Sequence, residues 1–132
     1  MIVLDASVVL DLLLNIQPLA GTIAARLGRD GETLHAPHLL DAEVFAAIRN
    51  HVRRRALNEE RGRVALRDLR ELRLTRYPIP PLMERMWEMR ESVSGFDAAY
   101  VALAEALDAP LVTTDRRLAR TRGHTARIET LV

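Results

Sequence analysis

The chain opens with Met1-Ile-Val-Leu-Asp5-Ala-Ser7, a short apolar run that stops at an acid. Apolar positions at helical spacing follow over 6–14, so a strand leads directly into a helix. Near the other end, Leu111-Val-Thr-Thr-Asp115 places a second acid after a second apolar run. Both acids are therefore expected at the carboxyl ends of buried strands, where open α/β sheets build their sites.

Extended and helical segments alternate through the rest of the chain. We expect helices over 18–27, 39–52, 58–74 with Asn58 as N-cap, 83–90, and from 94 or 95 to 107. Further extended segments are expected at 33–36, 111–114 and 126–132. Because parallel strands need crossover helices, this alternation predicts an α/β fold with a mainly parallel central sheet. The chain has 132 residues, 48% of them hydrophobic, and no linker is visible, so residues 1–132 are expected to form one domain.

The composition excludes several classes of protein. There is no cysteine, which rules out disulfides, a thiolate nucleophile and Cys-ligated zinc. Asp5 and Asp11 interrupt the apolar N-terminus, which also lacks the basic start of a secretory signal, so we expect no membrane span. A cytoplasmic location is the expectation that follows.

The net charge is +1, and all nineteen basic residues are arginine. If four of the eighteen acids held a metal ion, fourteen would remain against nineteen arginines, and the rest of the surface would be basic. A basic surface around an acidic site suits a polyanionic substrate. On charge alone, solvated salt bridges are the simpler explanation of the arginines.

Glu43 is the acid that most needs an explanation. Its neighbours three and four positions away on the expected helix are Leu39, Leu40, Ala46 and Ala47, so it interrupts an apolar face. A carboxylate buried there must protonate, pair or bind a metal ion.

Asp97 heads a second apolar face, which continues through Tyr100 and Val101. An alternative is that Asp97 belongs to a capping box with Ser94, and helix N-capping would likewise account for Asp5 and Asp115. If instead all four acids converge, a cation must neutralise them. Magnesium prefers oxygen ligands, and the absence of cysteine and of a His pair at ligand spacing argues against zinc.

Four segments together resemble the PIN domain, and within it the VapC-like toxins of toxin–antitoxin pairs. They are Ile2-Val-Leu-Asp5-Ala-Ser7, Pro37-His-Leu-Leu-Asp-Ala-Glu43-Val-Phe-Ala-Ala-Ile-Arg49, Phe96-Asp97-Ala-Ala-Tyr100-Val-Ala-Leu-Ala104 and Ala109-Pro-Leu-Val-Thr113-Thr-Asp115-Arg-Arg-Leu118. No single segment is specific, but their order, spacing and total length are. The resemblance spans the whole chain.

This resemblance implies a three-layer α/β/α domain, a Mg²⁺ site that Mn²⁺ can also fill, and hydrolysis of RNA phosphodiester bonds. The family's acids, which would bind the metal and serve catalysis, match Asp5, Glu43, Asp97 and Asp115. Ser7 and Thr113 match hydroxyl positions of the family, which would orient the metal ligands or bound waters without binding the metal ion themselves. A VapB-like antitoxin and a homodimer are the implied partners.

The basic residues leave more open. Where some relatives carry a further acid two residues after the last aspartate, this chain has Arg117, which leaves the number of metal ions undecided. Arg116, Arg117 and Arg49 are candidates for phosphate contacts, whereas the run 53–55 is interpreted as a solvated helix end. The alternative to a nuclease is a non-catalytic RNA-binding or scaffold domain. A phosphatase or phospho-receiver is disfavoured because the chain has no lysine.

Overall fold

The computed structural model describes residues 1–132, and its centre is a sheet of five strands. They are β1 (Ile2–Leu4), β2 (Leu34–Pro37), β3 (Thr75–Tyr77), β4 (Leu111–Thr113) and β5 (Ile128–Thr130). The strands lie in the order β3-β2-β1-β4-β5, and every neighbouring pair is parallel. The predicted parallel α/β sheet is confirmed.

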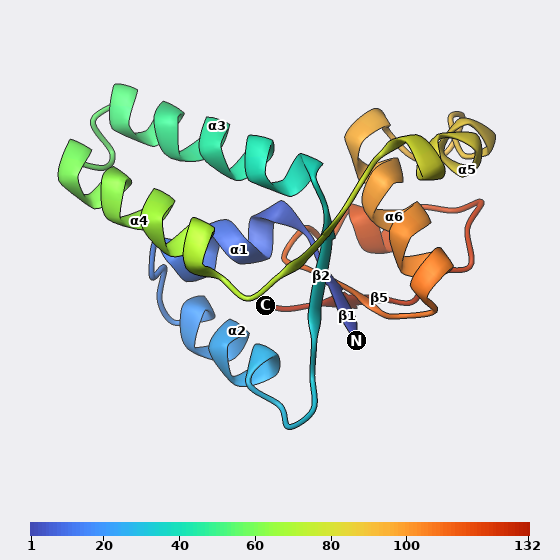
Figure 1. The fold of residues 1–132 in the computed structure, drawn as a ribbon, viewed down its shortest axis with the longest axis horizontal. Coiled ribbons are helices and arrows are strands. Elements are labelled where there is room, and N and C mark those ends of the chain that lie inside the picture. The colour runs from blue at the N-terminus through green and yellow to red at the C-terminus, as the bar shows by residue number, and fades with distance from the viewer.

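Helices cover both faces of the sheet (Figure 1). One layer contains α1 (Ala6–Leu13), α2 (Leu19–Leu27), α3 (Leu39–Arg53) and α4 (Glu59–Glu71), with α1 in contact with the other three. The other contains α5 (Met83–Glu88) and α6 (Gly95–Leu107), and α6 packs against β1, β2 and β4. Two short 3-10 turns, η1 (Pro80–Leu82) and η2 (Leu118–Arg120), complete the three-layer arrangement. None of the helices has the length and apolar character needed to cross a membrane.

The core explains why the central strands are apolar throughout. β1 and β4 are buried along their whole lengths, as expected for parallel strands covered on both faces. On α6 every residue from Ala98 to Ala104 is buried, and four of these seven are alanines that let the helix lie close to the sheet. One cluster of 26 buried hydrophobic residues joins the sheet to both helical layers.

The edge strand β3 is the main difference from the sequence-based expectation. The helix expected over 58–74 begins after Asn58, whose side chain accepts a hydrogen bond from the Arg61 backbone N–H as predicted, but it ends at Glu71. The chain then pairs with β2, and Arg76 makes hydrogen bonds of 2.6 and 3.0 Å to the carboxylate of Asp41 on α3. An ion pair across two elements thus fixes a strand that has no apolar alternation.

Arg26 fastens α2 to the opposite edge of the sheet. Its side chain is only 7% exposed, and its guanidinium binds Glu129 of β5 at 2.6 Å and Glu32 at 2.7 Å. Glu32 also accepts a hydrogen bond from the N-terminal ammonium of Met1 at 3.0 Å. Glu129 is 34% exposed, so the pair is only partly buried, but loss of either partner would leave Arg26 with less compensation for its charge. Arg26 therefore holds the last strand of the sheet in place.

Candidate metal centre

The site lies where the strand connections diverge. From the central strand β1 the chain first builds β2 and β3 on one side and later β4 and β5 on the other. Such a switch of direction leaves a crevice at the carboxyl ends of the two strands concerned, here β1 and β4. Asp5 directly follows β1, and Asp115 follows β4 after one intervening residue.

Asp5 is held by two hydroxyl groups from opposite ends of the chain. Its Oδ2 accepts hydrogen bonds from Thr113 Oγ1 at 2.6 Å and from Ser7 Oγ at 2.8 Å. The same hydroxyl oxygens accept hydrogen bonds from the backbone N–H groups of Asp115 and Thr114, respectively. Although Asp5 occupies the N-cap position of α1, its side chain makes no capping hydrogen bond. The capping alternative is therefore wrong for Asp5.

Glu43 projects from the first half of α3 and is held by a tyrosine that the sequence reasoning treated only as part of an apolar face. Tyr100 is 1% exposed, and its hydroxyl donates a hydrogen bond of 2.6 Å to Glu43 Oε1. Burial, reinforced by the adjoining Glu43 carboxylate, holds the pKa of Tyr100 well above its usual range, so the phenol stays a donor. Tyr100 follows Asp97 by three residues, which places the two on one face of α6.

Asp97 lies in the first turn of α6, where the helix dipole favours a negative charge. The side chain of Ser94 makes no capping hydrogen bond to the helix backbone. Instead, Ser94 Oγ donates to Asp97 Oδ2 at 3.1 Å. The alternative of a capping box is thus wrong, and the serine supports the carboxylate.

Asp115 is the acid for which the capping alternative holds in part. Its Oδ1 accepts a hydrogen bond of 2.9 Å from the Arg117 backbone N–H, and the Arg117 guanidinium lies 3.3 Å from both carboxylate oxygens. These contacts with Arg117 keep the pKa of Asp115 below its usual range. Arg117 itself is almost fully exposed, so it is free to leave the carboxylate when a stronger anion is available.

The four acids influence one another electrostatically. Burial raises the pKa of Glu43, and the carboxylates of Asp5 and Asp97 raise it further, against the opposing effect of Tyr100. Burial likewise raises the pKa of Asp97, with smaller contributions in the same direction from Asp5 and Asp115. Asp5, Glu43 and Asp97 form no ion pair. Among the basic residues, only Arg117 acts on this group, and its charge lowers the pKa of Asp97 slightly.

The free oxygens fit a hydrated magnesium ion. Asp5, Glu43 and Asp97 each use one carboxylate oxygen for the hydrogen bonds described above, and the second oxygen accepts none from the protein. The acids do not form a preassembled cage, since no three acidic or histidine side chains stand at the spacing that would enclose a bare ion. Mg²⁺ normally keeps several waters and binds directly to only one or two carboxylates, so its binding does not depend on such a cage.

The remaining arginine candidates lie at different distances from the acids. Arg116 directly follows Asp115 and is exposed. Arg49 lies on α3, about 120° around the helix from Glu43, and lines a groove between α3 and α4 with Phe45 and Leu66. Arg49 therefore does not share the face that carries the acid. Phosphate contacts by Arg116, Arg117 and Arg49 remain predictions.

Comparison with known proteins assigns the chain to a family. A model of the PIN domain matches residues 2–124, a span that contains all four acids. The chain belongs to the PIN-domain family. This PIN domain is 48% identical over 121 residues to Ribonuclease VapC9 of Mycobacterium tuberculosis, covering 92% of this chain and 91% of that protein.

It is also 43% identical over 129 residues to Ribonuclease VapC12 of the same organism, covering 98% of each chain. Among solved structures, the PIN domain matches a chain of VapBC2 from Rickettsia felis bound to a DNA fragment from its promoter. That match has a TM-score of 0.72 at 17% identity and covers 100% of both chains, which shows a shared fold.

Removing the Tyr100 hydroxyl is expected to weaken metal binding by the PIN domain. In Tyr100→Phe, Glu43 loses the hydrogen bond that orients it, and loss of such a supporting partner typically costs 10–100-fold in metal affinity. Titration calorimetry with Mn²⁺ would measure the change. Tyr77→Phe is the matched control, because the Tyr77 hydroxyl contacts His35 at 2.7 Å rather than an acid. Equal affinities in the two variants would contradict the role assigned to Tyr100.

Proposed function

We propose that this chain is a magnesium-dependent endoribonuclease, the toxin of a toxin–antitoxin pair, with residues 1–132 forming a single PIN domain. The observation that carries the proposal is the set of acids at the switch point of the sheet. Three of them form no salt bridge, and each offers an unused oxygen. The relatives at 43–48% identity are named ribonucleases, which supports RNA as the substrate.

The residues of the site would have different roles in phosphodiester hydrolysis. Asp5, Glu43 and Asp97 would hold the ion, with Asp115 as a further acid of the site. When bound, Mg²⁺ would make the attacking water more acidic and offset the negative charge that develops on the phosphate. One carboxylate would accept the proton of that water. Breakage of the bond to the 3′ oxygen leaves a 5′-phosphate and a 3′-hydroxyl.

Ser7 and Thr113 would act through Asp5 rather than on the substrate. Each donates a hydrogen bond to Asp5 Oδ2, which leaves Oδ1 directed elsewhere. Because the two hydroxyls come from α1 and β4, they fix the carboxylate relative to both of these elements. Arg116 and Arg117 would contact the phosphates that flank the cleaved bond.

Metal removal tests the function directly. We expect EDTA to reduce cleavage of total bacterial RNA by at least about 100-fold, with activity restored by Mg²⁺ or Mn²⁺. The product ends should be 5′-phosphate and 3′-hydroxyl, whereas a contaminating metal-independent ribonuclease leaves cyclic phosphates. Full activity in EDTA would eliminate the metal-dependent mechanism. RNA binding without cleavage at any metal concentration would favour the non-catalytic scaffold.

The proposed partners are a VapB-like antitoxin and a second copy of this chain. A solved structure that shares this fold is named as VapBC2, and another as a toxin–antitoxin complex from Klebsiella pneumoniae. On this chain, Trp87 is 65% exposed and Met83 is 55% exposed, and both line a recess at the junction of α5 and α6. An exposed apolar patch of this kind supports a protein–protein contact. Met89, which directly follows α5, is buried in the core and does not contribute to this patch.

A further inference from the structure

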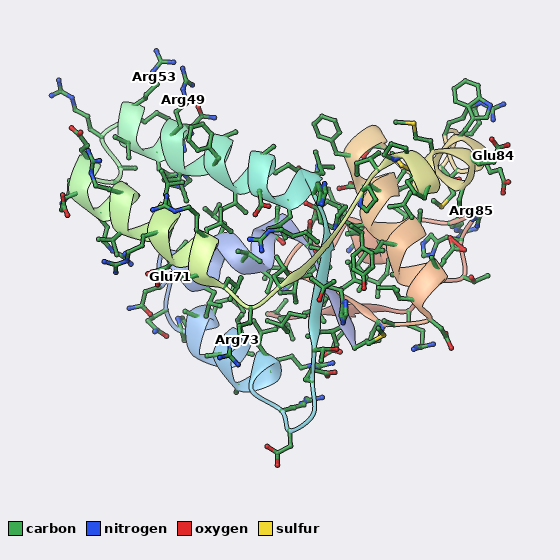
Figure 2. All side chains as sticks on the ribbon, in the orientation of Figure 1. Arg49, Arg53, Glu71, Arg73, Glu84 and Arg85 are labelled. Carbon is green, nitrogen blue, oxygen red and sulfur yellow. The ribbon has the colours of Figure 1, made fainter.

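The second half of α3 carries arginines that have no acidic partner. Residues 49–73 contain nine arginines and four acids, although the net charge of the whole chain is only +1. Arg49, Arg53, Arg54 and Arg55 are all exposed, and none of them forms an ion pair. Figure 2 shows Arg49 and Arg53 pointing away from α4 into solvent. This end of the helix is therefore a concentration of uncompensated positive charge.

Two of these arginines share a recess with an amide. Asn50, Arg53 and Arg54 line a recess of about 340 Å³ that contains no apolar side chain. The Asn50 side-chain oxygen Oδ1 accepts one long hydrogen bond, 3.3 Å, from Arg49. The amide N–H groups of Asn50 and the two guanidinium groups have no side-chain partner and are available as donors. A donor-rich lining without apolar side chains suits an oxyanion better than a protein segment, because protein interfaces are anchored by apolar and aromatic side chains.

Two of the three residues that line the recess lie on the same face of α3 as Glu43, and Arg53 lies about 80° away around the axis. An α-helix turns about 100° per residue, so Asn50 and Arg54, which follow Glu43 by seven and eleven residues, lie within about 20° of it around the axis. They are displaced along the helix by about 10 Å and 16 Å. Ala46 and Ala47 occupy the same face between them. No bulky side chain of α3 separates the acid from the arginines.

We propose that Asn50, Arg53 and Arg54 bind the phosphate backbone of the substrate RNA beyond the cleaved bond, an inference that rests on the proposed nuclease function. A guanidinium group matches two phosphate oxygens at once, and the Asn50 amide supplies a further donor. An RNA strand whose scissile phosphate lies at the acids would follow the alanine face of α3 into the recess. The run interpreted from sequence as a solvated helix end thus becomes a substrate subsite.

The experiment compares the loss of two charges from the recess with the loss of one charge from the neighbouring position outside it. In an Asp97→Asn background with Mg²⁺, fluorescence anisotropy would measure binding of a random-sequence single-stranded RNA of about 20 nucleotides at several salt concentrations. The double change Arg53→Gln with Arg54→Gln should weaken binding on the order of tenfold and reduce the salt slope by about 1.4, the value for two phosphate contacts to a single strand. Arg55→Gln, outside the recess, should leave affinity and slope nearly unchanged.

The outcomes separate this inference from the function on which it rests. If the wild-type protein cleaves RNA but the double variant binds no worse than Arg55→Gln, the subsite is wrong and the nuclease stands. If the double variant binds RNA more weakly but the wild-type protein never cleaves RNA, the subsite stands and the nuclease is wrong. Normal RNA affinity together with lost antitoxin binding would assign the recess to the antitoxin and overturn the proposal. A dinucleotide substrate, too short to reach the recess, should be cleaved equally with and without the two substitutions.

Discussion

Asp97→Asn should reduce RNA cleavage by at least about 10³-fold at saturating Mg²⁺, equivalent to roughly 4 kcal/mol of lost transition-state stabilisation. The amide keeps the shape of the side chain and an oxygen that can accept a hydrogen bond from Ser94. It removes one of the negative charges that would bind the metal ion. Initial rates on a single labelled RNA, measured over a range of Mg²⁺ concentrations, would provide the comparison.

The same variant should remain folded and gain stability at neutral pH. Because burial and nearby acids raise the pKa of Asp97 above its unfolded value, its charged form opposes folding. A raised carboxyl pKa favours the folded state at low pH, and this contribution is lost as the pH rises through the folded-state pKa. Asp97→Asn should therefore be the more stable protein at pH 7 in EDTA, with the advantage disappearing below about pH 4.

Asp108→Asn is a matched control for both measurements. Asp108 is exposed, far from the site in the turn after α6, and has a positive φ of 48° that asparagine also tolerates. This variant should cleave RNA at the wild-type rate and show no pH-dependent gain in stability. Wild-type cleavage by Asp97→Asn would remove Asp97 from the site.

A stoichiometric antitoxin complex is expected to have no detectable ribonuclease activity. An antitoxin arginine entering the crevice could bind two carboxylates at once and exclude the cation, because Asp5, Glu43 and Asp97 form no salt bridge within the chain. The same segment would occupy the path of the RNA phosphate. Cleavage assays on the complex purified after co-expression with the neighbouring small open reading frame would test this.

Two variants distinguish blockage of the site from binding elsewhere. If an arginine enters the crevice, Glu43→Gln should weaken the complex, whereas Asp30→Asn in the exposed turn after α2 should not. Full activity of the stoichiometric complex would disprove blockage. Light scattering would test the proposed homodimer separately, and a monomer at micromolar concentration would refute it.

The sequence predicted which strands and helices carry the acids, because a carboxylate that ends or interrupts an apolar run is easy to recognise. Asp5 and Asp115 end apolar runs, while Glu43 interrupts an apolar helix face, and the structure places them at strand ends and on α3 as expected. The parallel sheet followed from the alternation of strands and helices. These features depend on local patterns, which a single sequence displays.

Features that depend on pairing between distant residues were missed. No local sequence pattern around Tyr100 predicts that its hydroxyl donates a hydrogen bond to Glu43, 57 residues earlier. β3 has no apolar alternation and is held by the Arg76–Asp41 ion pair, so only the assembled sheet reveals it. The arginine candidates stay predictions. Distance from Glu43 along the chain favoured Arg49, whereas position around the helix favours Arg54.

The contact between Ser7 and Thr113 joins positions 106 residues apart in the sequence, and both hydroxyls converge on the first acid of the chain. During synthesis, a ribosome-bound chain that has exposed β1, β2 and α3 carries Asp5 and Glu43 but lacks α6 and β4. The central strand then has no neighbour on one side, and the acid that follows it has lost one of its two hydroxyl partners. Because α6 and β4 are made late, the four acids can come together only when translation is nearly complete. If these acids carry the proposed activity, we expect the nascent chain to be inert toward the messenger RNA that encodes it.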